Sequence, residues 1–277
     1  MELNDVSIVI VTFKSENKIF SCLDSISQNH DIFIIENSNN INFKNKVEKI
    51  NKKITCILTG ENKGYAIANN IGLSKVKTKY ALVLNPDTKL NKNAIENFIK
   101  RAKEYPDFWL MGPGNDQQKD FSIKSEKMNE VDNLKGFAIF FNLKKFNHSF
   151  FDENYFLYFE EIDLCKKVKK RGGKIFIDSE IIIKHEGASS VERNKELEFE
   201  KNRNWHWMWS TFYFHKKYKG FLTAFFLISP NLFSSLIKII FYQFIFNKYK
   251  RDIYYSRLSG ILNSILGKKS WYRPSID

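Results

Sequence analysis

The sequence has little cysteine. Its 277 residues include only three cysteines, Cys22, Cys56 and Cys165, with no CxxC spacing and no histidine cluster beside them. An odd, widely spaced set argues against a zinc site and a disulfide framework, and it favours a reducing compartment. Because 43% of the residues are apolar, the chain can build a sizeable core without disulfides.

Several diagnostic segments are also missing. No GxGxxG follows the first expected strand and no GxxxxGK[ST] occurs, so neither a Rossmann-type dinucleotide site nor a P-loop is supported. The opening MELNDVSIVIVTF carries acids before a short apolar run and has no small-residue cleavage site. We therefore expect it to form a first strand and not a signal peptide.

Acidic residues are scarce in the last quarter of the chain. From Lys201 onward, 13 lysines and arginines stand against 2 acids, a net +11 out of a formal net charge of +13 for the whole chain. Such a segment suits an anionic surface, such as lipid head groups or phosphorylated substrates. A merely solvated basic face is the simpler alternative. No clustered basic stripe with RNA-type motifs is present, so we expect no nucleic-acid partner.

Strands and helices alternate through the first half of the sequence. The apolar runs are SIVIVTF (7–13), DIFIIENS (31–38), KITCILTG (53–60) and YALVLNPD (80–87), and helical spacing follows the first, the third and the fourth of them, over 17–27, 66–73 and 93–103. This order predicts an α/β fold with a mostly parallel sheet, and ligands bind such sheets outside the carboxyl ends of the strands. The polar residues expected at these ends are Glu36, Asn37, Asn62, Asn85 and Asp87.

The fourth strand ends on an amide, a proline and a carboxylate. Pro86 stops the strand, so Asn85 and Asp87 are free to point out of the sheet. One carboxylate together with substrate phosphates is enough to hold Mg²⁺. Asn-Pro-Asp is also a good turn sequence, and taken alone this motif favours the turn.

A second acidic group follows the aromatic run FFDENYFLYF. Glu160, Glu161 and Asp163 open an expected helix, where the macrodipole accounts for one or two acids. The aromatic run should be partly buried, and grouped carboxylates in a partly dry site have raised pKa values. A general base for a sugar hydroxyl requires that property.

Two other stretches are candidates for ligand binding. His185 ends an apolar strand before Gly-Ala-Ser-Ser, where a histidine can bind a metal or phosphate, although a lone histidine is usually structural. The segment ENKGYAIANN (61–70) has small residues at a helix start, whose amides can bind an anion. A close-packed helix without a ligand is the alternative for that segment.

The segment from Phe221 to Phe246 is mostly apolar, holds a single charged residue, Lys238, and is interrupted by Ser229-Pro230-Asn231. Each half is too short to span a bilayer. We expect two helices, which either lie at a membrane interface or fold as core helices onto the main domain.

Together these stretches resemble the family 2 glycosyltransferases of the GT-A fold, in particular the rhamnosyltransferase-like branch of bacterial polysaccharide synthesis. The similar parts are SIVIVTFKSE, IIENS, ENKGYAIANNIGL, LVLNPD, FFDENYFLYFEEIDLC and IIIKHEGASS. The resemblance implies a transferase domain over 1–204. Residues 205–277 would then form a basic, aromatic helical region that is a candidate for membrane contact.

The resemblance also implies roles for the donor side. Residues expected to bind the nucleotide-sugar are Thr12, Phe13, Glu36, Asn62, Gly64, Ala66, Asn69 and Asn85. Asp87 and His185 would hold Mg²⁺ or Mn²⁺ at the diphosphate, and Arg193 or Arg203 would close over it.

On the acceptor side, the resemblance implies that Glu161 is the catalytic base, with Glu160 and Asp163 as alternatives. Gly136, Phe156 and Tyr158 would shape the acceptor site. Asn85 and Glu161 stand where relatives of this kind commonly have aspartate. This leaves Asp87 as the one firm metal carboxylate and changes the reach of the base.

The expected activity is inverting transfer of a sugar, with rhamnose as first candidate, from a dTDP- or UDP-sugar. The acceptor would be a saccharide or a polyprenyl-diphosphate-linked molecule at the cytoplasmic face of the inner membrane. The alternatives are a UDP-hexose or UDP-N-acetylhexosamine transferase of the same fold, or a non-catalytic nucleotide-sugar-binding protein.

Overall fold

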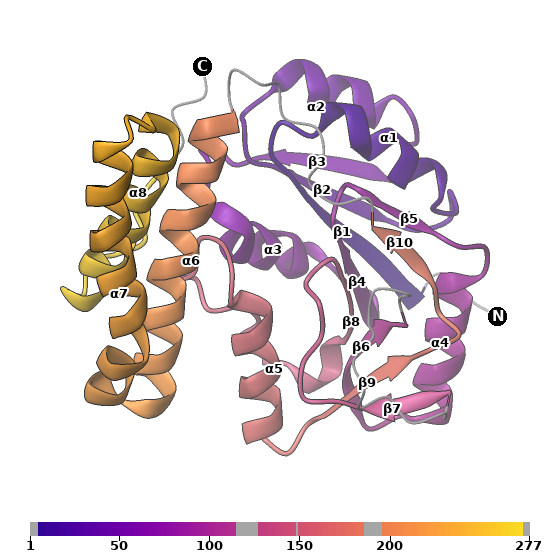
Figure 1. Cartoon of the computed structure of the whole chain (residues 1–277). Coiled ribbons are helices and arrows are strands. Elements are labelled where there is room, and N and C mark those ends of the chain that lie inside the picture. Colours follow the sequence, from indigo (N-terminus) through magenta and orange to yellow (C-terminus); the bar gives the residue numbers. More distant parts are fainter. Residues whose placement is uncertain (1–4, 115–126, 148, 186–195, 274–277) are drawn as a thin grey trace. The chain divides into compact units, whose positions relative to one another are not determined.

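The computed structural model describes residues 5–114, 127–147, 149–185 and 196–273. The chain divides into two compact units. Unit 1 consists of Met1–Asp152 and Glu161–Gly187, and unit 2 of Glu153–Glu160 and Ala188–Asp277 (Figure 1). Each unit has its own hydrophobic core.

Unit 1 is built on an eight-stranded sheet with the order β3-β2-β1-β4-β8-β6-β9-β7. Its strands are β1 (Val6–Thr12), β2 (Ile32–Glu36), β3 (Ile54–Leu58), β4 (Tyr80–Leu84), β6 (Phe108–Pro113), β7 (Met128–Glu130), β8 (Ala138–Asn142) and β9 (Lys174–Asp178). Strands β1 to β4 are mutually parallel, and β8 runs antiparallel between β4 and β6. The predicted mostly parallel sheet is therefore confirmed, although β6 and β9 were not foreseen.

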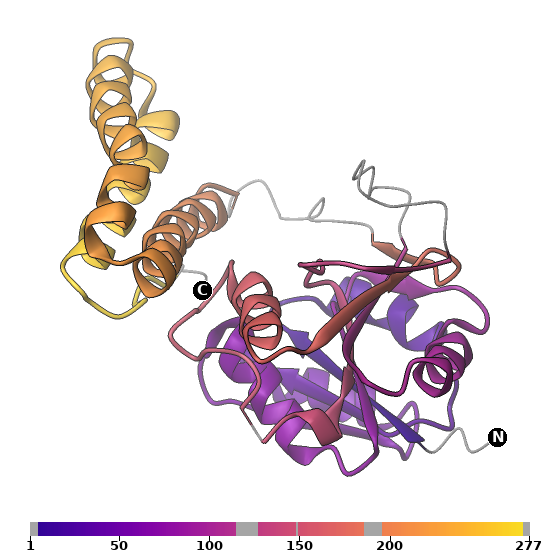
Figure 2. The same cartoon turned by 90° about the horizontal axis from the view of Figure 1, so that it is seen from below.

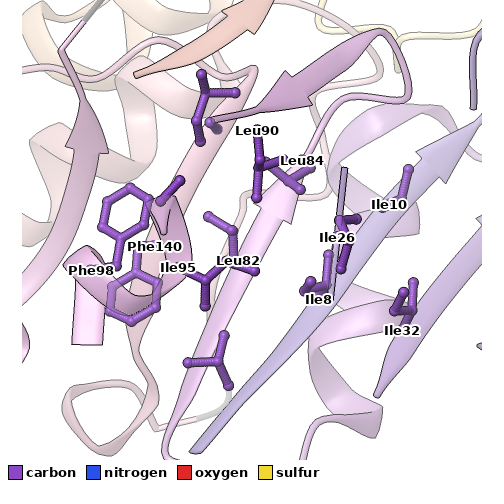
Figure 3. Close-up of a cluster of buried hydrophobic side chains, with 14 of the residues drawn as sticks. Ile8, Ile10, Ile26, Ile32, Leu82, Leu84, Leu90, Ile95, Phe98 and Phe140 are labelled. Atoms are coloured by element: carbon purple, nitrogen blue, oxygen red, sulfur yellow. The ribbon is translucent and has the colours of Figure 1, made fainter. Parts of the chain in front are cut away.

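Helices cover both faces of this sheet. They are α1 (Glu16–Asp24), α2 (Ile41–Glu48), α3 (Gly64–Lys75), α4 (Ala94–Glu104) and α5 (Glu160–Lys170), with a short 3₁₀ turn, η2 (Leu143–Lys145). Figure 3 shows the core on one face, where Leu82 of β4 lies beside Ile95 of α4 and Ile8 of β1 lies beside Ile26.

The other face of the sheet receives α3. A Cβ at Gly72 of α3 would lie 2.3 Å from Cγ1 of Val9 and 3.2 Å from Cγ1 of Ile35. Glycine therefore permits the close approach that fixes α3, and its N-terminus, against β1 and β2.

A second, two-stranded sheet sits after β4. In it β5 (Thr88–Leu90) pairs antiparallel with β10 (Ile183–His185), with Thr88 opposite His185. The sequence predicted the strand that ends in His185 but not its partner. This pairing brings the histidine next to the end of β4.

Unit 2 consists mainly of three helices, α6 (Glu196–Lys219), α7 (Phe221–Phe244) and α8 (Lys248–Ile265), which pack on one another (Figure 2). Their core contains Met208 and Phe212 of α6, Ala224 and Ile228 of α7, and Ile261 of α8. The boundary predicted between 204 and 205 lies within the continuous helix α6, and that division of the chain stays a prediction.

The expectation of two helices between Phe221 and Phe246 was wrong, because α7 is one helix with Pro230 inside it. Proline lacks the N–H that would bond to the carbonyl of Phe226 four residues earlier. The hydroxyl of Ser229 donates to that carbonyl at 2.9 Å. A local side chain therefore satisfies the carbonyl that the proline leaves unbonded. Among the described helices, α7 is long and apolar enough to cross a membrane, judged by length and composition alone.

Candidate active site

The carboxyl ends of β1, β2 and β4 meet at one edge of the sheet. Thr12, the last residue of β1, is opposite Glu36 in the register, and its carbonyl accepts from the N–H of Asn37 at 2.9 Å. Thr12 is buried and its hydroxyl is directed to the carbonyl of Ile35 at 3.5 Å, while Phe13 is half-buried. The strand ends therefore assemble as the sequence predicted, with Phe13 the more accessible of the two.

Glu36 is buried, and its carboxylate is engaged by the turn that follows. It accepts from the backbone N–H of Ser38 at 2.9 Å and of Asn40 at 2.7 Å, and also from the Ser38 hydroxyl. These contacts fix the loop at the end of β2. A direct contact between Glu36 and a nucleotide stays a prediction.

The start of α3 is tied to the end of β2. The amide of Asn37 donates to the carbonyl of Gly64 at 3.2 Å, and the Asn62 side chain accepts from the N–H of Gly64 at 3.1 Å. Gly64 has φ +81°, which favours glycine. Ala66 and Asn69 are fully buried, and the side-chain amide oxygen of Asn69, Oδ1, has no hydrogen-bond partner among the described residues. The predicted donor helix thus begins at the same edge as Thr12.

Asp87 and His185 form a contact pair beyond the end of β4. Asp87 Oδ1 lies 3.2 Å from His185 Nε2, and Asp87 Oδ2 lies 4.0 Å from Lys18 Nζ of α1. Burial opposes ionisation of Asp87, but its hydrogen bond and electrostatic attraction to His185, with Lys18 beyond, keep the pKa of the carboxyl below its ordinary value. Asp87 is therefore a carboxylate at neutral pH, as a metal ligand must be.

Hydrogen bonds of the Thr88 side chain hold the turn that carries Asp87. The Thr88 hydroxyl donates to the carbonyl of Asn85 at 2.7 Å, and the thiol of Cys22 lies 3.5 Å from the same hydroxyl. Burial raises the pKa of Cys22 to about 11, so this thiol is neutral and acts as packing. Asn85-Pro86-Asp87 thus does form a turn, and that turn presents Asp87 to His185.

The Asp87–His185 pair fits a divalent cation that is completed by substrate. With metal–ligand bonds of about 2.1 Å, neighbouring ligands of an octahedral ion lie about 3 Å apart, close to the observed 3.2 Å. Within the described ranges, no group of three or more His, Cys, Asp or Glu side chains could hold a metal by itself. Any ion here would take its other ligands from phosphate oxygens and water, which is usual for Mg²⁺.

Glu161 opens the unit 1 part of α5 and lies against Gly136. A Cβ placed on Gly136 would be 3.6 Å from Cγ and 3.7 Å from Cδ of Glu161, so the carboxyl end of the side chain rests on the glycine. Burial raises the pKa of Glu161, although the N–H groups of Glu161 and Ile162 oppose the shift. A carboxylate of raised pKa is a stronger proton acceptor than an ordinary glutamate.

Residues 136 and 137 connect the two acidic groups. The carbonyl of Gly136 accepts from the Tyr65 hydroxyl of α3 at 2.7 Å. The Phe137 ring stacks on His185 with centroids 4.9 Å apart and 9° between the planes, and its carbonyl accepts from the N–H of Asn85 at 2.8 Å. One short segment therefore contacts His185, the start of α3 and the candidate base Glu161. Lys18, Tyr65 and Phe137 were missed, because no local pattern marks a residue that acts through a distant neighbour.

The remaining predicted residues are placed differently. Glu160 and Asp163 are buried. In unit 2, Phe156 stacks on His206, Tyr158 meets Trp207 edge to face, and Arg203 pairs with Glu200 at 2.8 Å. Arg193 lies outside the described residues. The roles predicted for these side chains, in catalysis for Glu160 and Asp163 and in donor or acceptor binding for the others, stay predictions.

The open α/β sheet is that of a GT-A fold, and the carboxylate–histidine pair lies beyond its fourth strand, at the edge where such sheets bind ligands. The chain belongs to glycosyl transferase family 2, because the sequence model of that family matches residues 7–165. This confirms the family part of the resemblance.

Two curated relatives match by sequence. The low-salt glycan biosynthesis hexosyltransferase Agl10 of Haloferax volcanii is 24% identical over 195 residues, covering 61% of this chain and 62% of that protein. The teichoic acid poly(glycerol phosphate) polymerase of Staphylococcus epidermidis is 28% identical over 107 residues, covering 36% of this chain and 15% of that protein. The chain thus spans less than two thirds of the length of either relative.

Solved structures show the same fold. The mannosyltransferase PcManGT from Pyrobaculum calidifontis, in complex with GDP-Man and Mn²⁺, has a TM-score of 0.60 at 10% identity, covering 96% of this chain and 88% of that one. S. aureus TarS 1–349 in complex with UDP-GlcNAc has a TM-score of 0.54 at 14% identity, covering 97% and 93%. At these identities the likeness shows the fold alone.

Proposed function

We propose that the protein transfers a hexosyl group from a nucleoside-diphosphate sugar to a hydroxyl, with inversion at the anomeric carbon. The observation that carries this proposal is the connection at one sheet edge of the Asp87–His185 pair to Glu161 through Phe137 and Gly136. The pair suits a diphosphate with its cation, and Glu161 suits a hydroxyl proton.

On the donor side, Thr12, Phe13 and Glu36 would line the nucleoside, and the start of α3 from Asn62 to Asn69 would line the phosphates and sugar. Asp87 and His185 would hold Mg²⁺ or Mn²⁺, which when bound neutralises the diphosphate and makes it a better leaving group. The solved structure of PcManGT carries Mn²⁺ with GDP-Man, which supports this part of the proposal.

In the chemical step, the Glu161 carboxylate takes the proton of the acceptor hydroxyl as its oxygen attacks the anomeric carbon. The new carbon–oxygen bond forms on the face opposite the diphosphate. The bond to the diphosphate oxygen breaks, and its electron pair leaves with the nucleoside diphosphate. The proton ends on Glu161, whose raised pKa favours holding it.

The donor that we propose to test first is dTDP-rhamnose, because of the resemblance to the rhamnosyltransferase-like branch, with UDP-hexoses and UDP-N-acetylhexosamines next. The acceptor would be a growing saccharide, free or on a polyprenyl diphosphate, at the cytoplasmic face of the membrane. The sequence relatives named for glycan and teichoic acid synthesis support a role in a cell-surface polymer.

A thermal-shift panel tests the donor site. The protein is melted with dTDP, UDP or GDP, each with and without Mg²⁺ or Mn²⁺. A ligand that binds only the folded state adds about 2.7 kcal/mol of stability at a concentration of one hundred times its Kd. We expect a metal-dependent rise with one nucleotide, lost in Asp87→Asn and kept in the matched control Asp132→Asn, whose side chain is 85% exposed.

The donor site and the transfer activity can fail separately, if turnover is measured beside the thermal shifts. No shift with any nucleotide in the presence of metal would refute the donor site. A normal shift without turnover of any donor, in a protein with Glu161 intact, would instead favour the non-catalytic nucleotide-sugar-binding protein.

A further inference from the structure

Helix α7 of unit 2 has apolar residues on two opposite sides. On the inner side, Ala224, Ile228, Ser235 and Ile239 are buried. Ala224 and Ile228 pack there with residues of α6 and α8. This side accounts for the helix as part of a folded three-helix unit.

The outer side of α7 is also apolar, and nothing in the described chain covers it. Its side chains are 58–75% exposed and recur every three, four or seven residues, so they form one stripe along the helix. The residues of this outer stripe are Leu222, Phe226, Phe233, Ile237, Ile240 and Phe244. At 1.5 Å per residue the stripe is about 33 Å long, and contiguous exposed apolar surface of this size marks an interaction site.

Basic side chains stand at both ends of the outer stripe. Lys216, Lys217 and Lys219 precede it, and Lys248 and Lys250, with Arg251, follow it. From Lys201 through Arg251 the sequence contains nine lysines and arginines and no aspartate or glutamate. An apolar stripe between clusters of cations is the pattern that binds the interface of an anionic bilayer.

We propose that the outer stripe of α7 lies in the plane of an anionic membrane surface, with the six flanking basic residues on lipid head groups. A spanning orientation is disfavoured because the inner side of α7 is buried on α6 and α8, which carry many charged residues and would have to enter the bilayer with it. Self-pairing along the stripe is disfavoured because either direction would bring like-charged ends together. The inference rests on unit 2 alone and does not require glycosyl transfer.

The test is co-sedimentation of the full chain with vesicles of phosphatidylcholine alone or mixed with phosphatidylglycerol. We expect binding to the mixed vesicles and at least tenfold weaker binding to the neutral ones. Phe226→Glu/Ile237→Glu should weaken binding to the mixed vesicles at least tenfold. The matched control is Ile41→Glu/Ile50→Glu in unit 1, which adds the same charge at isoleucines that are 53% and 45% exposed.

A second variant tests the basic ends. Replacing Lys216, Lys219 and Lys248 by serine should weaken binding roughly fivefold for each residue, since one basic residue near an anionic surface contributes about that factor. Lys52→Ser/Lys92→Ser/Lys100→Ser, at exposed lysines of unit 1, makes the same change in net charge and should have little effect.

Three results would overturn the inference. The stripe variant could bind like the wild type. The protein could resist extraction by alkaline carbonate, as a spanning protein does. Or it could form dimers in analytical ultracentrifugation that the stripe variant abolishes, which would make the stripe a self-association surface. Nucleotide-induced thermal shifts should be equal in the stripe variant and the wild type, so failure here is separable from failure of the proposed function.

Discussion

Replacing Glu161 by glutamine separates its chemical role from its structural one. Glutamine keeps the size of the side chain, so its packing on Gly136 is retained. It cannot accept the hydroxyl proton, and general base catalysis by a positioned side chain contributes typically 10²–10⁴-fold. We expect turnover to fall by that factor, which corresponds to about 2.7–5.5 kcal/mol in activation free energy.

The raised pKa of Glu161 adds a prediction about stability. A carboxyl whose pKa is raised by folding favours the folded state below its ordinary pKa, and that contribution is lost as the pH rises through the raised value. Burial makes the ionised form of Glu161 unfavourable in the folded protein, and glutamine has no charge to bury. Glu161→Gln should therefore melt at an equal or higher temperature than the wild type at neutral pH, with the difference shrinking in acid.

The assay measures release of nucleoside diphosphate with acceptor present, over a range of pH, beside melting curves. The wild-type rate should rise with pH through the raised pKa of Glu161, and the residual rate of Glu161→Gln should lack that rise. Glu130→Gln, at a surface glutamate of β7 paired with Lys169, is the control. Unchanged turnover and an unchanged pH profile in Glu161→Gln would refute the assignment of the base.

Three further predictions concern packing and positioning. Gly72→Ala should destabilise unit 1 by about 1–3 kcal/mol in a denaturant titration, because its Cβ would lie 2.3 Å from Cγ1 of Val9 in the core; an unchanged midpoint would show that α3 moves freely. Ser229→Ala should lower the stability of unit 2 by about 0.5–1.5 kcal/mol, since the Phe226 carbonyl loses its hydroxyl donor; Ser229→Thr should restore it. Phe137→Leu should remove the ring stacked on His185 and raise the metal concentration needed for the nucleotide-induced thermal shift, without altering the shift at saturating metal.

The sequence was informative wherever neighbours along the chain decide the structure. Apolar runs ending in polar residues predicted β1 to β4, and they placed Glu36 and Asp87 at one edge, because parallel strands bring their carboxyl ends together. The small residues of ENKGYAIANN correctly predicted a helix start packed against that edge.

The sequence was less informative where distant segments pair. Strand β5 has three residues and no usable periodicity, so its pairing with β10, which brings His185 to Asp87, could not be read locally. Phe137 stands beside a predicted residue, yet only the fold stacks its ring on that histidine. Pro230 misled the prediction because proline disrupts helices in general. The Ser229 hydroxyl compensates for it only in a rotamer that points to the Phe226 carbonyl, and the sequence does not give that rotamer.

The three carboxylates at the start of α5 show why spacing could not choose among them. Glu160 and Asp163 are buried, while Glu161 is half-buried and rests on Gly136. Because position 136 is a glycine, no side chain covers the Glu161 carboxyl group from there, whereas a larger residue would. A catalytic base must be exposed enough to reach the substrate and buried enough for its pKa to be raised. Of the three, only Glu161 is partly exposed, and burial raises its pKa, which is the physical reason to test it first.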